Sequence, residues 1–460
     1  MPISSFHGVE TALRGLLAQQ RAIDITGQNI ANASTPGYSR QRVETSASHA
    51  LSINVAGGRA QLGQGVDVTG IERIRDRFAD VQFRAQNAKL GEAQTKASLL
   101  GQAELAFSEP GDKGLSAQLN RFWSSWSDVA NSPTSISGRQ VLLDTAKGLA
   151  TSFANLDDQL ATVQKQAQAE FDNITAAGGP IDLAVQEIAE LNEAIGTAIG
   201  RGDAPNDLLD RRDLLLDKLS GFAQVRTEPT LDGNGAPIPG QLDVYLGTDA
   251  TPLVSGGQSR SPFSLSFAAT GPGSGSLGAL AAVASPTGPI AEYRAQLAQS
   301  AQEIAGAVNG VHQAAGGPPI FTVPAGAPVS GVPQRPLEVG AGIDPAKGGS
   351  LDAIVAGSTS VNDVATAIAA LRGKTGDQRY RALVGKLGSE VAEANREEAT
   401  AQTLAGALQD RRDSVSGVSP DEEMANLVKF QRGYQASARV LSTMDEMLDT
   451  LINRTGRVGL

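Results

Sequence analysis

The segment PDEEMANLVKFQRGYQASARVLSTMDEMLDTLIN, residues 420–453, has the clearest pattern in the chain and decides the fold class. Its mostly apolar stripe advances in steps of three and four residues, which is the spacing of a coiled-coil seam. Ser419, Pro420 and the acidic residues that follow predict a helix start. We therefore expect one helix about 50 Å long. The stripe consists of Met424, Leu427, Gln431, Tyr434, Ala438, Leu441, Met444, Leu448 and Leu451.

The beginning of the chain carries a second helical pattern. Apolar residues recur at helical spacing from Val9 to Ile30. This helix should end near Asn32, because Pro36 follows and proline cannot continue a helix. Because both terminal helices carry a narrow apolar seam, we expect them to pack on each other or on neighbouring subunits. The alternative is that each is an ordinary amphipathic helix that packs on a globular core. The predicted assembly seam contains Leu13, Leu16, Ile23, Leu427, Tyr434, Leu441, Leu448 and Leu451, and the predicted structural turn is Thr35, Pro36 and Gly37.

Composition excludes several classes of protein. A chain of 460 residues exceeds the usual size of one hydrophobic core, so two or more domains are expected. A net charge of −11 argues against a nucleic-acid partner, because neutralising phosphates requires a basic patch. The absence of cysteine excludes disulfides and thiolate metal sites. No basic and apolar leader opens the chain, so we expect no cleavable signal peptide, and the most apolar stretch (277–284) is too short for membrane insertion.

The middle of the chain is mostly helical, with one change of period. Residues 224–269 alternate as strands do, and Asn234-Gly235 predicts a hairpin. The predicted fold is mainly α with a small β segment, a central helical bundle and long terminal helices that pair as a coiled-coil-like unit. The expected domains are a discontinuous terminal assembly domain (1–48 and 416–460), a helical body with an extended N-terminal segment (49–223 and 287–415), a β segment (224–286), and a short Pro/Gly-rich region (322–377).

Three patterns could suggest chemistry, and each has a simpler explanation. Residues 273–278 match GxGxxG, but Pro286 ends the following helix after about two turns, too early for a dinucleotide site. The residues from Asp232 onward begin like a calcium-binding loop, but such a site is excluded because Pro237 occupies the position where the loop needs glycine. The aspartates at 207, 210, 213 and 217 share one helical face with interleaved basic residues, which predicts a solvated helix with internal ion pairs. We expect no enzyme activity, and no catalytic, cofactor-binding or metal-binding residues.

Both ends of the chain resemble one family. Residues 29–38 (NIANASTPGY) resemble the N-terminal signature shared by flagellar rod, hook and hook-associated proteins, and residues 39–41 (SRQ) resemble the hook–filament junction family, FlgK. Residues 416–452 resemble the C-terminal helix of that family, and 187–192, 206–220 and 308–312 resemble its internal helices. The chain departs from the family after Phe321, where members often carry a large outer domain and only the region 322–377 remains here.

The resemblance implies a structural subunit that joins hook to filament. It implies export through the flagellar type III channel, an extracellular location at the junction, and a chaperone on the C-terminal helix. It also implies contacts with the hook protein and with the second junction protein, and self-association in a ring or tube. A hook or rod subunit is the alternative, and the segment 208–220 argues against it.

Overall fold

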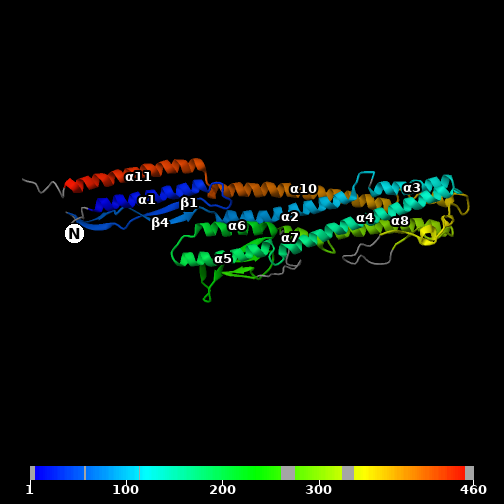
Figure 1. Ribbon diagram of the computed structural model, residues 1–460, viewed down its shortest axis with the longest axis horizontal. Coiled ribbons are helices and arrows are strands. Elements are labelled where there is room, and N and C mark those ends of the chain that lie inside the picture. The colour runs from blue at the N-terminus through cyan, green and yellow to red at the C-terminus, as the bar shows by residue number, and fades with distance from the viewer. Residues whose placement is uncertain (1–5, 56–57, 113, 261–274, 324–335, 451–460) are drawn as a thin grey trace, which may run out of the picture.

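The computed structural model describes residues 6–55, 58–112, 114–260, 275–323 and 336–450. The molecule is an elongated rod of helices (Figure 1). At one end, α1 (His7–Ala31) and α11 (Pro420–Asp449) lie side by side and antiparallel, with α11 outermost (Figure 1). The predicted mainly α fold is confirmed; its β structure consists of a few small sheets, one of them within the predicted β segment (224–286).

A two-stranded ribbon lies on the other side of α1. It pairs β1 (Gln41–Ala47) with β4 (Val66–Arg73) in antiparallel register, and β2 (Leu51–Val55) with β3 (Gly58–Leu62) beyond them. The strands β2, β3 and β4 form the extended segment that the sequence predicted from residue 49 onward. The helices α1 and α11 together with this ribbon are called the terminal unit below.

The body of the rod is a bundle built around one large cluster of buried apolar residues. Within it, α2 and α10 run side by side along the rod, and α10 leads directly toward α11 (Figure 1). Trp126 is fully buried in the cluster. The helices of the bundle are α2 (Arg77–Phe107), α3 (Leu115–Asn131), α4 (Ile136–Thr175), α5 (Pro180–Gly200), α6 (Asn206–Phe222), α7 (Gly275–Ala284), α8 (Pro289–Ala314), α9 (Asp363–Ala369) and α10 (Thr375–Ser416).

A small antiparallel sheet packs against α5. Its order is β5 (Val225–Leu231), β6 (Pro237–Leu246), β7 (Val254–Ser255) and β8 (Gln258–Ser259). The predicted hairpin at Asn234-Gly235 joins β5 to β6, and Gly235 has a φ of 81°, which favours glycine. The predicted alternation of apolar residues at 263, 265 and 267 lies outside the described residues.

The region after Phe321 is short. There β9 (Phe321–Thr322) pairs with β10 (Glu338–Val339), and three 3-10 turns follow at Ala341–Ile343, Pro345–Lys347 and Leu351–Ala353 before α9. Within the ranges that the structure describes, no helix is long and apolar enough to cross a membrane.

Candidate assembly site

The terminal helices approach each other closely because small residues line their contact. A Cβ atom on Gly8 would lie 2.9 Å from the Met444 methyl carbon, and one on Gly433 would lie 2.9 Å from the Gln19 side chain. Asn29 at the end of α1 bonds to Glu423 at the start of α11. The antiparallel register therefore extends over most of both helices.

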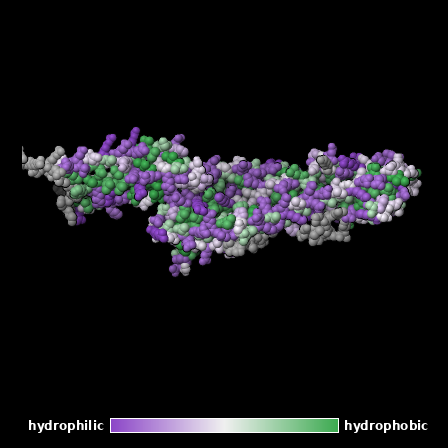
Figure 2. Space-filling model, in the orientation of Figure 1, coloured by the Kyte–Doolittle hydropathy of each residue, from purple (hydrophilic) through white to green (hydrophobic). Residues whose placement is uncertain are grey.

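The outer faces of this helix pair leave apolar side chains in solvent. Among the described residues of α11, Glu423 alone is buried, whereas Met424 is 53% exposed, and Val440 and Met447 are each 47% exposed. On α1, Leu17 is 50% exposed. Figure 2 shows hydrophobic residues gathered on the surface at this end of the rod. A free chain therefore keeps an apolar surface here that a neighbouring protein could cover.

The residues of the predicted seam lie in two environments. Leu13 and Tyr434 are exposed. Leu441 lies between Ser437 and Met444 on the face of α11 that meets α1, because residues three and four apart share a helix face. The half-buried members are Leu16, Ile23, Leu427, Leu441 and Leu448, and Leu451 lies outside the described residues.

Asn29 is a buried hub at the end of α1. Its amide nitrogen donates to the Gln41 carbonyl oxygen (2.8 Å) and to the Glu423 carboxylate (3.0 Å). Its amide oxygen accepts from the Gln41 amide (3.0 Å) and from the Tyr38 hydroxyl (2.8 Å). One side chain thus ties together α1, β1, α11 and the turn between α1 and β1. Arg40 adds an ion pair of 2.6 Å to Glu423.

The predicted turn follows α1 directly. The Thr35 amide donates to the Asn32 carbonyl oxygen, and the Tyr38 amide donates to that of Thr35. Pro36 is exposed, whereas Gly37 has a φ of 81° and packs on α6. A Cβ atom on Gly37 would lie 3.1 Å from the Leu214 side chain. Both the backbone angle and the close contact favour glycine at this position.

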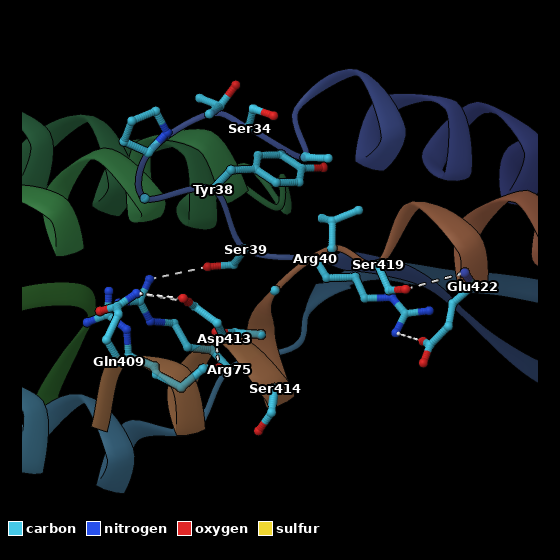
Figure 3. Close-up of a pocket in the computed structure, with 18 residues that line it drawn as sticks. Ser34, Tyr38, Ser39, Arg40, Arg75, Gln409, Asp413, Ser414, Ser419 and Glu422 are labelled. Carbon is cyan, nitrogen blue, oxygen red and sulfur yellow. Dashed lines mark hydrogen bonds and ion pairs between the residues drawn. The ribbon is translucent and has the colours of Figure 1, made fainter. Parts of the chain in front are cut away.

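Three backbone segments cross side by side from the terminal unit to the body, and this crossing is called the neck. The Arg40 amide donates to the Ser416 carbonyl oxygen (2.9 Å), and the Ile74 amide donates to the Arg40 carbonyl oxygen (2.8 Å). Figure 3 shows the polar cavity of about 640 Å³ beside the neck, with Arg40 reaching Glu422 on one side and Arg75 reaching Ser39 on the other.

Buried ion pairs hold the neck to the body. Asp217 accepts from Arg84 and from Arg412, each at 2.7 Å, and so joins α6 to α2 and α10. Asp210 accepts from Arg73 (2.6 Å) and from the Ser39 amide (3.1 Å). The full set, called the neck network, consists of Asp80, Asp210, Asp213, Asp217, Arg73, Arg75, Arg84 and Arg412.

The prediction for this part of α6 was wrong. The sequence suggested a solvated helix with internal ion pairs, but Asp210 and Asp217 are buried. Their cationic partners come from β4, α2 and α10, not from α6 itself. Sequence spacing shows which residues share a helix face, but it does not show which distant elements cover that face.

The electrostatics of the neck follow from burial and from this pairing. Burial opposes ionisation of Asp213, but Arg75, Arg73, Arg84 and Arg212 outweigh it and lower the pKa of its carboxyl. Burial, together with the nearby acidic groups, raises the pKa of Tyr38 to about 12. Both groups therefore keep one charge state at neutral pH, with Asp213 ionised and Tyr38 neutral.

The patterns that could suggest chemistry have structural roles. Gly275 starts α7 at a φ of 66°, and a Cβ atom there would lie 2.5 Å from the Phe222 backbone, so this glycine allows two elements to pack. Asp232 accepts from the Asn234 and Ala236 amides and closes the hairpin. Within the described ranges, no group of three or more His, Asp or Glu residues could hold a metal ion.

Comparisons with known proteins cover the same regions. Family models of flagellar basal body rod proteins match residues 10–38 and 410–454, which contain most of α1 and all of α11. The family model for the helical domain of flagellar hook-associated protein FlgK matches residues 100–317. The terminal unit and the helical body together thus define a flagellar axial protein.

Relatives identify the family within this class. Flagellar hook-associated protein 1 of Bacillus subtilis (strain 168) is 32% identical in an alignment of 505 positions, which spans 98% of this chain and 99% of the relative. The protein of the same name from Escherichia coli (strain K12) is 24% identical over 97% of this chain and 99% of its own length. The chain belongs to the family of flagellar hook-associated protein 1, so the resemblance inferred from the sequence is confirmed.

A solved structure is also similar in part. The flagellar hook junction protein FlgK from Burkholderia pseudomallei shares 23% identity, and the match covers 53% of this chain and 47% of that chain. Its TM-score of 0.45 is too low for that likeness to carry an argument about this fold.

Proposed function

We propose that this chain is a structural subunit of the bacterial flagellum at the junction of hook and filament. Copies of the chain pack through their terminal units into a ring or tube. The observation that carries the proposal is the apolar surface of α11, where Met424, Val440 and Met447 stand about half exposed. Removing such side chains from water contributes about 25 cal/mol per Å² of apolar area, which makes this surface a favourable place for contact between subunits.

The predicted seam and turn have separate roles in this proposal. Leu441 holds α11 on α1 within one subunit, since it is half-buried on the face that meets α1. The exposed residues of α1 and α11 contact neighbouring subunits. The turn at Thr35, Pro36 and Gly37 and the neck network set the direction of the terminal unit relative to the body. In the domain division proposed at residues 48 and 416, the boundary at 416 lies at the neck, whereas the boundary at 48 lies just past β1 within the ribbon, because the chain crosses the neck near Arg40 and Ile74.

The partners follow from a position between two assemblies. We expect the chain to contact the hook protein on one side and the second junction protein on the other, outside the cell. An export chaperone would cover α11 before export, since among the described residues of the terminal unit this helix carries the largest number of exposed apolar side chains. The role is structural and requires no cofactor. The match of residues 100–317 to the FlgK helical domain favours the junction over a hook or rod subunit.

Immunolabelling of isolated flagella tests the location. Antibodies against the full chain should mark a narrow band at the boundary of hook and filament. Labelling along the whole hook, or within the rod, would favour the alternative axial proteins. Cells that lack the chain should release filament protein into the medium and retain hooks without filaments.

A further inference from the structure

A buried histidine lies at the far end of the body and takes no part in the terminal unit. His312 is in the last turn of α8 and is fully buried. This helix runs toward the end of the rod opposite α11 (Figure 1). Its Nδ1 atom lies 2.7 Å from the Pro318 carbonyl oxygen, and its Nε2 atom lies 2.9 Å from the Val355 amide nitrogen. The ring therefore connects α8 to Pro318, just before Phe321, and to Val355, within the region that follows Phe321.

The two partners fix the protonation of the ring. The Val355 amide can only donate, so Nε2 is the unprotonated acceptor. The Pro318 carbonyl can only accept, so Nδ1 carries the proton. The arrangement thus fits the neutral imidazole alone. A second proton on Nε2 would point at the Val355 N–H group and leave that amide without its acceptor.

The surroundings do not compensate for a charge on the ring. Burial lowers the pKa of His312. The Gly317 backbone lies so close to the His312 ring that a Cβ atom there would be 2.1 Å from it. The Trp126 ring packs edge-on against the imidazole, with the two ring centres 6.3 Å apart. The imidazole therefore has no room to turn. On α3, Asp128 is exposed to solvent. The other charged groups of the nearby segments are engaged: Asp344 with Lys147, Asp352 with Arg139, and Asp363 with Ser358 and Thr359.

We propose that His312 is an acid-sensitive latch that holds the segment around Val355 on the end of α8 at neutral pH and releases it in mild acid. Ile354 and Ala356 on either side of Val355 are buried core residues, so release opens the core at this end. Asn309, one turn earlier on α8, holds Phe321 through two hydrogen bonds that do not titrate. The acid-sensitive contact is therefore confined to the Val355 side.

The pH window follows from the direction of the pKa shift. Because the closed state binds a proton less readily than the open state, the contact is most stable above the ordinary histidine pKa of 6.5. As the pH falls below 6.5, the ratio of open to closed segments rises about tenfold per pH unit. The rise stops at the lowered pKa of His312 in the closed state, below which both states are protonated.

Two measurements on the full-length protein test the latch. The chain has three histidines, so ¹⁵N-histidine labelling gives three imidazoles to follow by NMR. His312 should show the Nδ1–H tautomer at pH 7.5 and titrate below 6.5. Over the same range, hydrogen exchange should show the protection factor at Val355 falling about tenfold per pH unit.

Variants separate His312 from other acid effects. In His312→Gln the side-chain oxygen can accept from Val355 at any pH, so the protection factor should become independent of pH between 7.5 and 5. His7→Gln and His49→Gln should behave as the wild type. The proposal is overturned if His312 titrates with no change at Val355, or if His312→Gln retains the same pH dependence. Should His312→Gln fail to fold, the wild-type measurements alone decide.

Discussion

Replacing Asp217 with asparagine should weaken the joint between α6, α2 and α10 severely. Asp217 accepts one short bond from Arg84 and one from Arg412, and all three side chains are about nine-tenths buried. The asparagine side chain would keep the shape of the aspartate but lose its negative charge, which in the wild type balances two buried guanidinium groups. Removing one partner of a buried pair costs about 3–5 kcal/mol. We take about 3 kcal/mol, because Asp213 and Asp80 still lie 3.3 and 3.6 Å from these arginines.

Native-state hydrogen exchange of the α6 amides measures this effect. A loss of about 3 kcal/mol lowers their protection factors roughly a hundredfold. The matched control is Glu187→Gln on α5, which removes the ion pair between Glu187 and the exposed Arg211 on α6. Exposed pairs contribute about 1 kcal/mol or less, so the control should change protection less than about fivefold. A change in Asp217→Asn no larger than in the control would show that the Asp217 carboxylate does not hold this joint together.

Three further predictions concern the terminal unit. Gly37→Val should misdirect the strand after the turn and reduce motility, because valine resists a φ of 81°, and Pro36→Ala should be milder. Val440→Asp should leave the free protein folded but block incorporation into flagella, while Thr443→Asp, at an exposed polar position, should incorporate normally. Asn29→Ala should destabilise the terminal unit by about 1–3 kcal/mol, since it leaves the buried Gln41 amide without an acceptor; unchanged exchange at Gln41 would contradict this.

Acid stability gives one more test of the neck. Because the arginines lower the pKa of Asp213, its contribution to stability is fully present above the ordinary carboxyl value of 3.8. The contribution is lost as the pH falls through the lowered pKa of the folded state. Protection of α6 should therefore persist at pH 4.5 and decline only well below it. A decline centred above pH 4.5 would show that Asp213 is not held by its cations.

Local signals in the sequence predicted the elements well. The sequence pattern predicted that α11 starts at Pro420, and Asn234-Gly235 predicted the hairpin between β5 and β6. Both predictions succeeded because each signal acts within a few residues along the chain. The break after Asn32 was also visible, since α1 ends at Ala31. These features depend on backbone angles and helix periodicity, which the local sequence determines.

The long-range contacts of the candidate site could not be predicted in this way. Asn29 and Glu423 are 394 positions apart, and nothing in either segment indicates that they meet. The same holds for Asp217 and Arg412. The one available signal was the set of carboxylates on the face of α6, with arginines just before α2, within α2 and near the end of α10, and this pattern alone favoured the solvated arrangement. Only packing distinguishes between them.

Chemical labelling of a single cysteine on α11 tests whether neighbouring subunits cover this helix in flagella. The chain has no cysteine, so Val440→Cys carries one thiol on the exposed face, and Leu231→Cys, on the hairpin that projects from the body, serves as the reference. Each variant would be treated with a maleimide as a free monomer and in isolated flagella. Val440→Cys should react readily in the monomer and be protected in flagella, while Leu231→Cys should react in both. Equal reaction of Val440→Cys in monomer and flagella would contradict the claim that neighbouring subunits cover this face.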